Sequence, residues 1–114
     1  MPAHSSRFPA VRLAVLLTLA LFSSGCSKSV VLRSADGDLT LDYRCSRIRP
    51  QAESIEQIQL LASYARRVAR DAAANQRYTT AMSIRNAFQD RDVRRMEAEI
   101  VDYICEYGYP DGSG

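Results

Sequence analysis

The sequence predicts a mainly α-helical domain in which an antiparallel helical hairpin follows a short β-hairpin and one disulfide closes the fold. The second helix has a potential break near Asp90. Three observations support this prediction: helical spacing of apolar residues after residue 50, alternation of apolar and polar residues around Asp36-Gly37, and a widely spaced cysteine pair. The 114 residues divide into a leader (1–25), a tether (26–29), one small domain (30–108) and a flexible tail (109–114).

The leader has the composition of a secretory signal. Arg7 and Arg12 give it a basic start, the ten residues from Leu13 to Phe22 are apolar, and small residues follow. Ten helical residues rise only about 15 Å, half the thickness of the hydrocarbon core of a bilayer, so this run is too short to span a membrane stably. We therefore expect an export signal that is removed.

The end of the leader, Ser24-Gly25-Cys26, resembles the lipobox of bacterial lipoprotein signal peptides, although Ser23 stands where leucine is commonest. The resemblance implies cleavage before Cys26 and attachment of acyl chains, palmitate among them, to that residue. Because Ser27 rather than Asp follows, it also implies sorting to the periplasmic face of the outer membrane. Several acyl chains anchor a protein stably. The alternative is an ordinary secretory cut near Gly25 that leaves Cys26 as a free or paired thiol.

The first element of the domain is a predicted β-hairpin with Asp36-Gly37 as a two-residue type I′ turn. This turn sets a register in which Leu32 faces Leu41 and Val30 faces Tyr43 on one apolar side. The opposite face is mostly polar. The alternative is a disordered tether in which the alternation is accidental.

The first helix is predicted over residues 50–75. Pro50 suits a first helical turn, and Glu53 and Glu56 would lie near the positive end of the helix dipole. The apolar stripe of this helix is made by Ile55, Ile58, Ala62, Ala65, Ala69 and Ala72. Its alanine-lined second half would permit another helix to approach closely.

The second helical region is predicted to begin near Ala81, with Thr79 or Thr80 as its cap. Its first apolar residues, Met82, Ile84 and Phe88, are expected to pack on the alanines of the first helix. Acids at 90 and 92 interrupt the stripe, and either can cap a fresh start. Apolar residues then continue at helical spacing through Val93, Met96, Ile100, Tyr103 and Tyr107. Gly108 is expected to end the helix.

Cys45 and Cys105 are expected to form the disulfide. If Cys26 carries lipid, these two remain as an even pair in an oxidising compartment. They lie symmetrically about residue 75, where the helical hairpin is predicted to turn, so they would meet at its open end. Two buried free thiols are the alternative.

The composition excludes several functions. Removing residues 1–25 takes away Arg7, Arg12 and the single histidine, His4, and leaves 13 basic and 13 acidic residues. A neutral exported domain is not expected to bind nucleic acid. No phosphate-binding loop or hydrolase motif is present, and the carboxylates of Glu97 and Glu99 diverge on a helix. We expect no enzyme activity, no cofactor and no metal site.

The candidate interface residues are Arg67, Arg94 and Tyr107. Arginine suits carboxylate and phosphate recognition and is enriched at binding hot spots, as is tyrosine. The alternative is that the arginines are solvated side chains which reflect a GC-rich genome. The expected function is a non-catalytic structural or interaction module, docked on an envelope protein or secretion assembly. Two alternatives remain: an immunity or inhibitor lipoprotein acting on a periplasmic effector or hydrolase, and a peptidoglycan-binding module.

Overall fold

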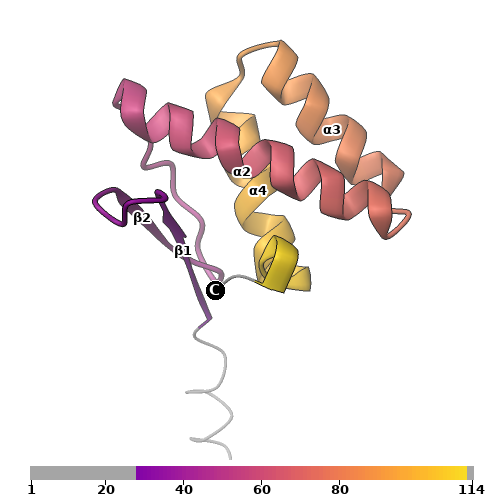
Figure 1. The fold of residues 1–114 in the computed structure, drawn as a ribbon, viewed down its shortest axis with the longest axis horizontal. Helices are drawn as coiled ribbons and strands as arrows, with labels where there is room; N and C mark the ends of the chain where they lie inside the picture. Colours follow the sequence, from indigo (N-terminus) through magenta and orange to yellow (C-terminus); the bar gives the residue numbers. More distant parts are fainter. Residues whose placement is uncertain (1–27, 113–114) are drawn as a thin grey trace, which may run out of the picture.

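The computed structural model describes residues 28–112, which form a mainly helical domain with one small antiparallel sheet (Figure 1). Both the predicted fold class and the disulfide are confirmed. The elements in chain order are β1 (Ser29–Arg33), β2 (Thr40–Arg44), α2 (Ile55–Ala74), α3 (Tyr78–Gln89), α4 (Val93–Tyr107) and the 3₁₀ turn η1 (Pro110–Gly112).

The β-hairpin has the predicted register. Leu32 pairs with Leu41 and Val30 with Tyr43, and all four side chains are buried. The prediction of a type I′ turn was wrong. Such a turn needs a positive φ at both Asp36 and Gly37, and only Gly37 has one, of 79°. The Asp36 carboxylate instead accepts hydrogen bonds from the Asp38 amide and the Ser34 hydroxyl, which stabilises a longer loop.

The outer edge of β1 is closed by two tyrosine hydroxyls. Tyr109 accepts a hydrogen bond from the Val31 amide (2.9 Å), and Tyr64 accepts one from the Arg33 amide (3.2 Å). An edge strand with free amides is a template for pairing with another chain. These contacts occupy two such amides, so β1 is held against α2 and the carboxyl-terminal turn.

The first helix begins later than predicted. Ser54 caps α2 through a reciprocal capping box with Gln57, and Ile55 is 70% exposed rather than part of the buried stripe. The preceding backbone at Gln51 and Ala52 donates its amides to Glu97 of α4. This tertiary contact keeps residues 50–54 out of the helix.

The predicted break near Asp90 is confirmed and produces a third helix. Asp92 caps α4 by accepting a hydrogen bond from the Arg95 amide, at 3.2 Å. Helix α3 begins at Tyr78 and lacks the predicted threonine cap. Figure 1 shows α3 folding back along α2 and α4 then crossing behind α2. The second helical region is therefore two helices that pack on different sides of α2.

The core is formed where α2 meets α3, α4, β1 and η1. Small residues allow close approach to α3: Ala65, Ala69 and Ala72 are buried on α2, and Ala81 and Ala87 on α3. The prediction that Met82 packs on these alanines was wrong, since Met82 is 54% exposed, and Phe88 is only partly covered. Of the three apolar residues predicted to meet α2, Ile84 alone is buried.

The carboxyl-terminal residues differ from the predicted flexible tail. Gly108, with a φ of 92°, ends α4 as expected. Beyond it, Pro110 is buried and η1 packs against α2, while Tyr109 reaches β1. Residues 109–112 therefore belong to the domain.

Candidate functional site

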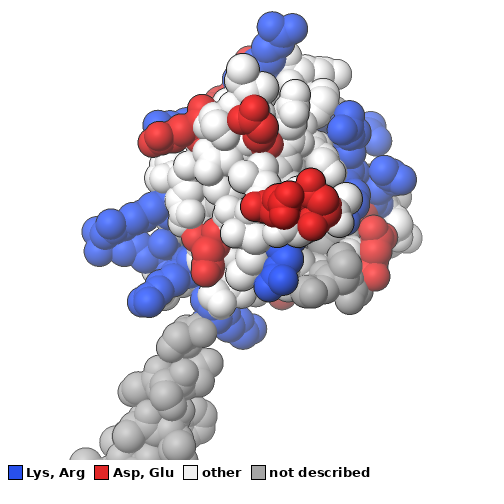
Figure 2. Space-filling view, turned by 60° about the vertical axis from the view of Figure 1, so that its left-hand side comes forward, with Lys and Arg blue, Asp and Glu red and all other residues white. Residues whose placement is uncertain are grey.

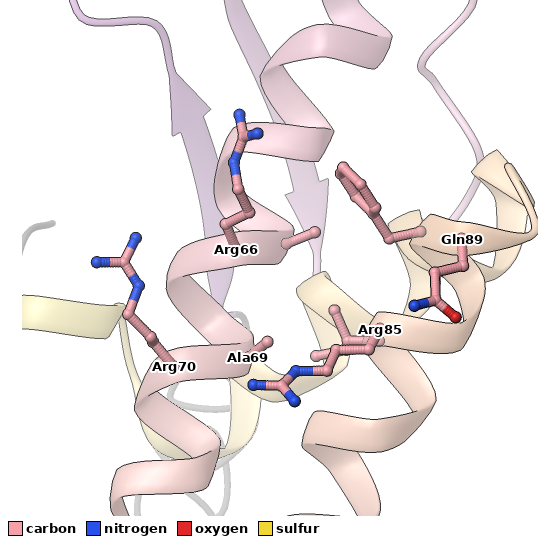
Figure 3. A pocket seen from close by; sticks show the side chains of 8 residues that line it. Arg66, Ala69, Arg70, Arg85 and Gln89 are labelled. Carbon is pink, nitrogen blue, oxygen red and sulfur yellow. The ribbon is translucent and has the colours of Figure 1, made fainter.

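A groove of about 270 Å³ lies between α2 and α3, and we call it the α2–α3 groove (Figure 3). Its lining is made by Ala65, Arg66, Ala69, Arg70, Ile84, Arg85, Phe88 and Gln89. The floor is apolar because alanines on α2 leave a gap beside Ile84 and Phe88 of α3. The small side chains that let the helices approach thus also create the groove.

The rim of this groove is positively charged. Arg66 and Arg70 project from α2, and Figure 3 shows Arg85 reaching from α3 toward Ala69. The Arg66 guanidinium lies 5.9 Å from the centre of the Phe88 ring. Arg70 and Arg85 form no hydrogen bond or ion pair with any residue in the range 28–112, and no carboxylate lines the groove. The rim therefore carries charge that the domain itself leaves unneutralised.

The outer face of α3 extends the apolar surface beside the groove. Tyr78 is 62% exposed and Met82 is 54% exposed. They are four residues apart and so lie on the same side of the helix. Arg85 follows one turn later, which links this exposed stripe to the groove rim.

A second cluster of polar groups is centred on the buried side chain of Glu97. The Glu97 side chain, 2% exposed, accepts hydrogen bonds on one carboxylate oxygen from the Tyr43 hydroxyl and from the amides of Gln51 (2.9 Å) and Ala52 (3.0 Å). We call this cluster the Glu97 junction. It joins β2, the segment before α2, and α4. Burial raises the pKa of Tyr43, and the hydrogen bond to Glu97 and its charge raise that pKa further.

A third cluster joins the ends of α2 and α4. Tyr103 donates a hydrogen bond to the Asp71 carboxylate and accepts one from Arg77 at 2.9 Å. Desolvation raises the pKa of Tyr103, the hydrogen bond to Asp71 raises it further, and Arg77 opposes this shift. The Arg77 guanidinium also lies 3.5 Å from the centre of the Tyr107 ring. This arrangement fixes the helix ends and leaves Tyr107 45% exposed.

The predicted interface residues do not meet at one place. Arg67 is half-buried, with its guanidinium 4.0 Å from the centre of the Tyr64 ring and its buried Nε without a hydrogen-bond partner. Arg94 is exposed in the first turn of α4, and Tyr107 is that helix's last residue. They lie thirteen helical steps apart, which corresponds to about 20 Å along the helix axis. None of the three lines the α2–α3 groove.

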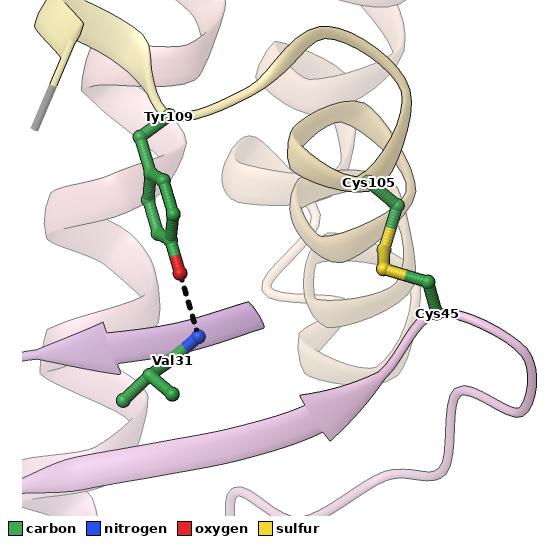
Figure 4. Close-up of a disulfide and its surroundings, with 4 residues drawn as sticks. All are labelled: Val31, Cys45, Cys105 and Tyr109. Atoms are coloured by element: carbon green, nitrogen blue, oxygen red, sulfur yellow. Dashed lines mark hydrogen bonds between the residues drawn. A yellow bond between two sulfur atoms is a disulfide. The ribbon is translucent and has the colours of Figure 1, made fainter. Parts of the chain in front are cut away.

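The predicted pairing of the two cysteines that the structure describes is confirmed. Cys45 and Cys105 form a disulfide with a Cα–Cα distance of 5.8 Å (Figure 4). A bond across 60 residues stabilises a chain by about 4 kcal/mol in the chain-entropy model. It ties the end of β2 to α4 next to the contact of Tyr109 with β1. Cys26 lies outside the described residues.

Sequence reasoning missed two features. Arg85 was absent from the candidate arginines because its place beside Arg66 depends on how α3 packs against α2. Glu97 was considered only as one of two carboxylates that diverge on a helix, and its burial was not predicted. Its spacing of three from Ile100 and four from Val93 and Val101 places it inside an apolar stripe, and that spacing was the available signal.

Residues 28–112 contain no group of three or more histidine, cysteine, aspartate or glutamate side chains that could hold a metal ion. Within the same range no helix is long and apolar enough to cross a membrane. Comparison with known proteins found no protein family, no curated protein and no solved structure that matches this chain.

Proposed function

We propose that this chain is a lipoprotein, anchored through Cys26 at the periplasmic face of the outer membrane, that acts as a non-catalytic interaction module of the cell envelope or a secretion assembly. The anchor rests on the lipobox resemblance of Ser24-Gly25-Cys26. The interaction role rests on one observation, the α2–α3 groove with its apolar floor and its rim of three arginines.

The groove suits an acidic protein segment that carries a large apolar side chain. Ile84 and Phe88 offer apolar contact on the floor, and an anchor that fills such a pocket supplies much of the energy of binding. Carboxylates beside this anchor would pair with the guanidinium groups of the rim. Those of Arg70 and Arg85 have no hydrogen-bond or ion-pair partner within residues 28–112 and are available for such a pair. Charge pairs of this kind chiefly set register and association rate.

The side chains that line the groove favour binding over catalysis. They are alanine, arginine, isoleucine, phenylalanine and glutamine. None of these side chains acts as a nucleophile or exchanges a proton near neutral pH. The apolar floor also favours a protein segment over a polar cell-wall polymer. An immunity or inhibitor role would use the same groove and would differ in the identity of the acidic partner.

Site-specific photo-cross-linking in cells tests this proposal. A photoreactive residue at Gln89, which lies exposed in the groove lining, should cross-link to an acidic segment of one envelope protein, identified by mass spectrometry. The matched control is the same residue at Ala98, which is exposed on α4 and outside the groove.

Charge reversal gives the second arm of the experiment. Arg66→Glu with Arg85→Glu should abolish the cross-link from Gln89, because the rim would then repel the carboxylates. Cross-linking that is equal at Gln89 and Ala98, or that survives the reversal, contradicts the proposed site. Hydrolytic turnover by the purified protein would contradict the non-catalytic class.

A further inference from the structure

A second concentration of positive charge lies at the amino-terminal end of the described chain. It consists of Lys28, Arg44 at the end of β2, and Arg47 and Arg49 in the loop that follows. We call this set the basic loop patch. All four side chains are exposed. Figure 2 shows Lys and Arg side chains gathered on the side of the domain where the described chain begins.

The backbone places this patch beside the tether. Ser29 pairs with Arg44 across the hairpin, and the Cys45 amide donates a hydrogen bond to the Lys28 carbonyl at 2.9 Å. The Arg47 amide in turn donates to the Arg44 carbonyl at 3.1 Å, and the disulfide from Cys45 ties the loop to α4. The first two contacts hold Arg44 beside the amino-terminal end, and the other two fix the turn that carries Arg47.

The length of the tether limits how far the patch can stand from a membrane. Only Ser27 separates Cys26 from Lys28. Two residue steps reach at most about 7 Å, which is less than the Debye length of about 8 Å at physiological ionic strength. If Cys26 carries lipid, as proposed above, Lys28 and Arg44 lie within range of the headgroup charges.

We propose that the basic loop patch binds the phosphate groups of anionic lipids and so fixes the orientation of the anchored domain on the membrane. Guanidinium groups bind phosphate oxygens in a bidentate manner, and basic residues next to an anchor are attracted by anionic headgroups. Two carboxylates lie nearby: Asp42 lines the same hollow as the three arginines, and Glu106 lines an adjacent hollow with Lys28. They leave the four cations with an excess of positive charge.

This orientation would expose the α2–α3 groove. Figure 1 shows α3 on the side of the domain away from the start of β1, and the β-hairpin packs on α2 and α4. With the patch on the membrane, the groove faces the aqueous side, where an envelope protein can reach it. The same short tether argues for a lipid surface rather than an acidic protein as the occupant of the patch.

Amide hydrogen exchange of the full protein, purified from membranes, tests the inference. The protein is reconstituted into vesicles of phosphatidylcholine alone and of phosphatidylcholine with phosphatidylglycerol. Exchange in residues 44–49 should be slower on the anionic vesicles, and high salt should remove the difference. The variant Arg44→Gln/Arg47→Gln/Arg49→Gln should lose this protection. The control variant Arg66→Gln/Arg70→Gln/Arg85→Gln, which removes the groove rim instead, should keep it.

The outcomes separate this inference from the proposed function. Mass spectrometry of the same sample determines whether Cys26 carries lipid, and an unmodified amino terminus overturns both the anchor and the orientation. Lipidated protein with equal exchange on the two vesicle types overturns the orientation alone. Protection that needs an added envelope protein, rather than anionic lipid, shows that the patch binds protein and also overturns the inference.

Discussion

The Glu97 junction and the α2–α3 groove both place charged side chains beside apolar ones. They differ in whether the charged group has hydrogen-bond partners within the chain. At the junction, a buried carboxylate receives hydrogen bonds from the Tyr43 hydroxyl and two backbone amides of the same chain. At the groove, Arg70 and Arg85 form no hydrogen bond or ion pair with residues 28–112. The first charge is part of the fold, and the second is available to a partner.

This difference has an energetic basis. A buried charge is tolerated only when the protein itself supplies its hydrogen bonds, so each partner of Glu97 becomes necessary to the others. An exposed guanidinium is solvated by water, and its removal changes stability little. Burial with internal partners therefore indicates a structural role, whereas exposure beside an apolar floor supports the binding role that we propose for the α2–α3 groove.

The largest expected effect is at the junction. Glu97→Ala leaves the Tyr43 hydroxyl and the Ala52 amide buried without an acceptor and also removes the acceptor of the Gln51 amide, which should lower the unfolding free energy by about 3 kcal/mol or more. Urea denaturation of the purified protein measures this. Glu106→Ala, at an exposed carboxylate of the same helix, is the control and should change stability by less than about 0.5 kcal/mol. Equal effects of the two variants would show that the junction is not structural.

A smaller effect is expected at alkaline pH. The pKa of Tyr43 is raised in the folded state, so the unfolded chain releases this proton first, beginning near pH 10. The stabilisation is fully present below that pH and is lost as the pH rises further, by up to about 1.4 kcal/mol per pH unit. In Tyr43→Phe the phenylalanine at position 43 does not ionise in either state. The unfolding free energy of this variant should therefore fall less steeply as the pH rises above about 10.

The measurement is the unfolding free energy across this pH range. The control is Tyr103→Phe, because the pKa of Tyr103 is also raised but its hydrogen bonds go to Asp71 and Arg77. Tyr103→Phe should leave unchanged the part of the alkaline loss of unfolding free energy that Tyr43 causes. A slope unchanged by Tyr43→Phe would mean that the junction does not disfavour ionisation of that hydroxyl.

The smallest effect on stability is expected at the groove. Replacing Arg66, Arg70 and Arg85 together by alanine should change the melting temperature little, because Arg70 and Arg85 have no partner in the described chain and each exposed site contributes at most about 0.5 kcal/mol. Thermal unfolding by circular dichroism measures this. A loss as large as that of Glu97→Ala would place the arginines in the fold and erase the contrast between the two regions.

Local patterns were sufficient for most of the fold. Alternation around Gly37 predicted the pairing of Leu32 with Leu41, since a slip by one residue would turn the apolar face to water. The acids at 90 and 92 predicted the break between α3 and α4, because an aspartate that interrupts an apolar stripe can cap a new helix, and the structure shows that Asp92 is the cap. These signals lie within a few residues of the structure that they produce.

The disulfide was predicted correctly as a pair of cysteines, but the place in the fold where they were expected to meet was wrong. Cys45 and Cys105 pair as expected, but they do not meet at the open end of a two-helix hairpin. The turn at residues 90–92 sends α4 across α2, and Cys105 then reaches the end of β2. Their separation along the chain indicated the pair, whereas only the packing of α4 determined the route.

The sequence by itself determined the hairpin register, the helical segments, the break between α3 and α4, and the cysteine pair, because each depends on short-range spacing or on a small number of residues of one type. Tertiary structure decided the start of α2, the burial of Glu97 and the groove. Residues 50–54 stay out of α2 because Gln51 and Ala52 donate to a carboxylate 45 or more positions away. Arg66 and Arg85 share a rim only because alanines let α3 lie close to α2. Such contacts depend on how faces of distant elements meet, and no local pattern contains that geometry.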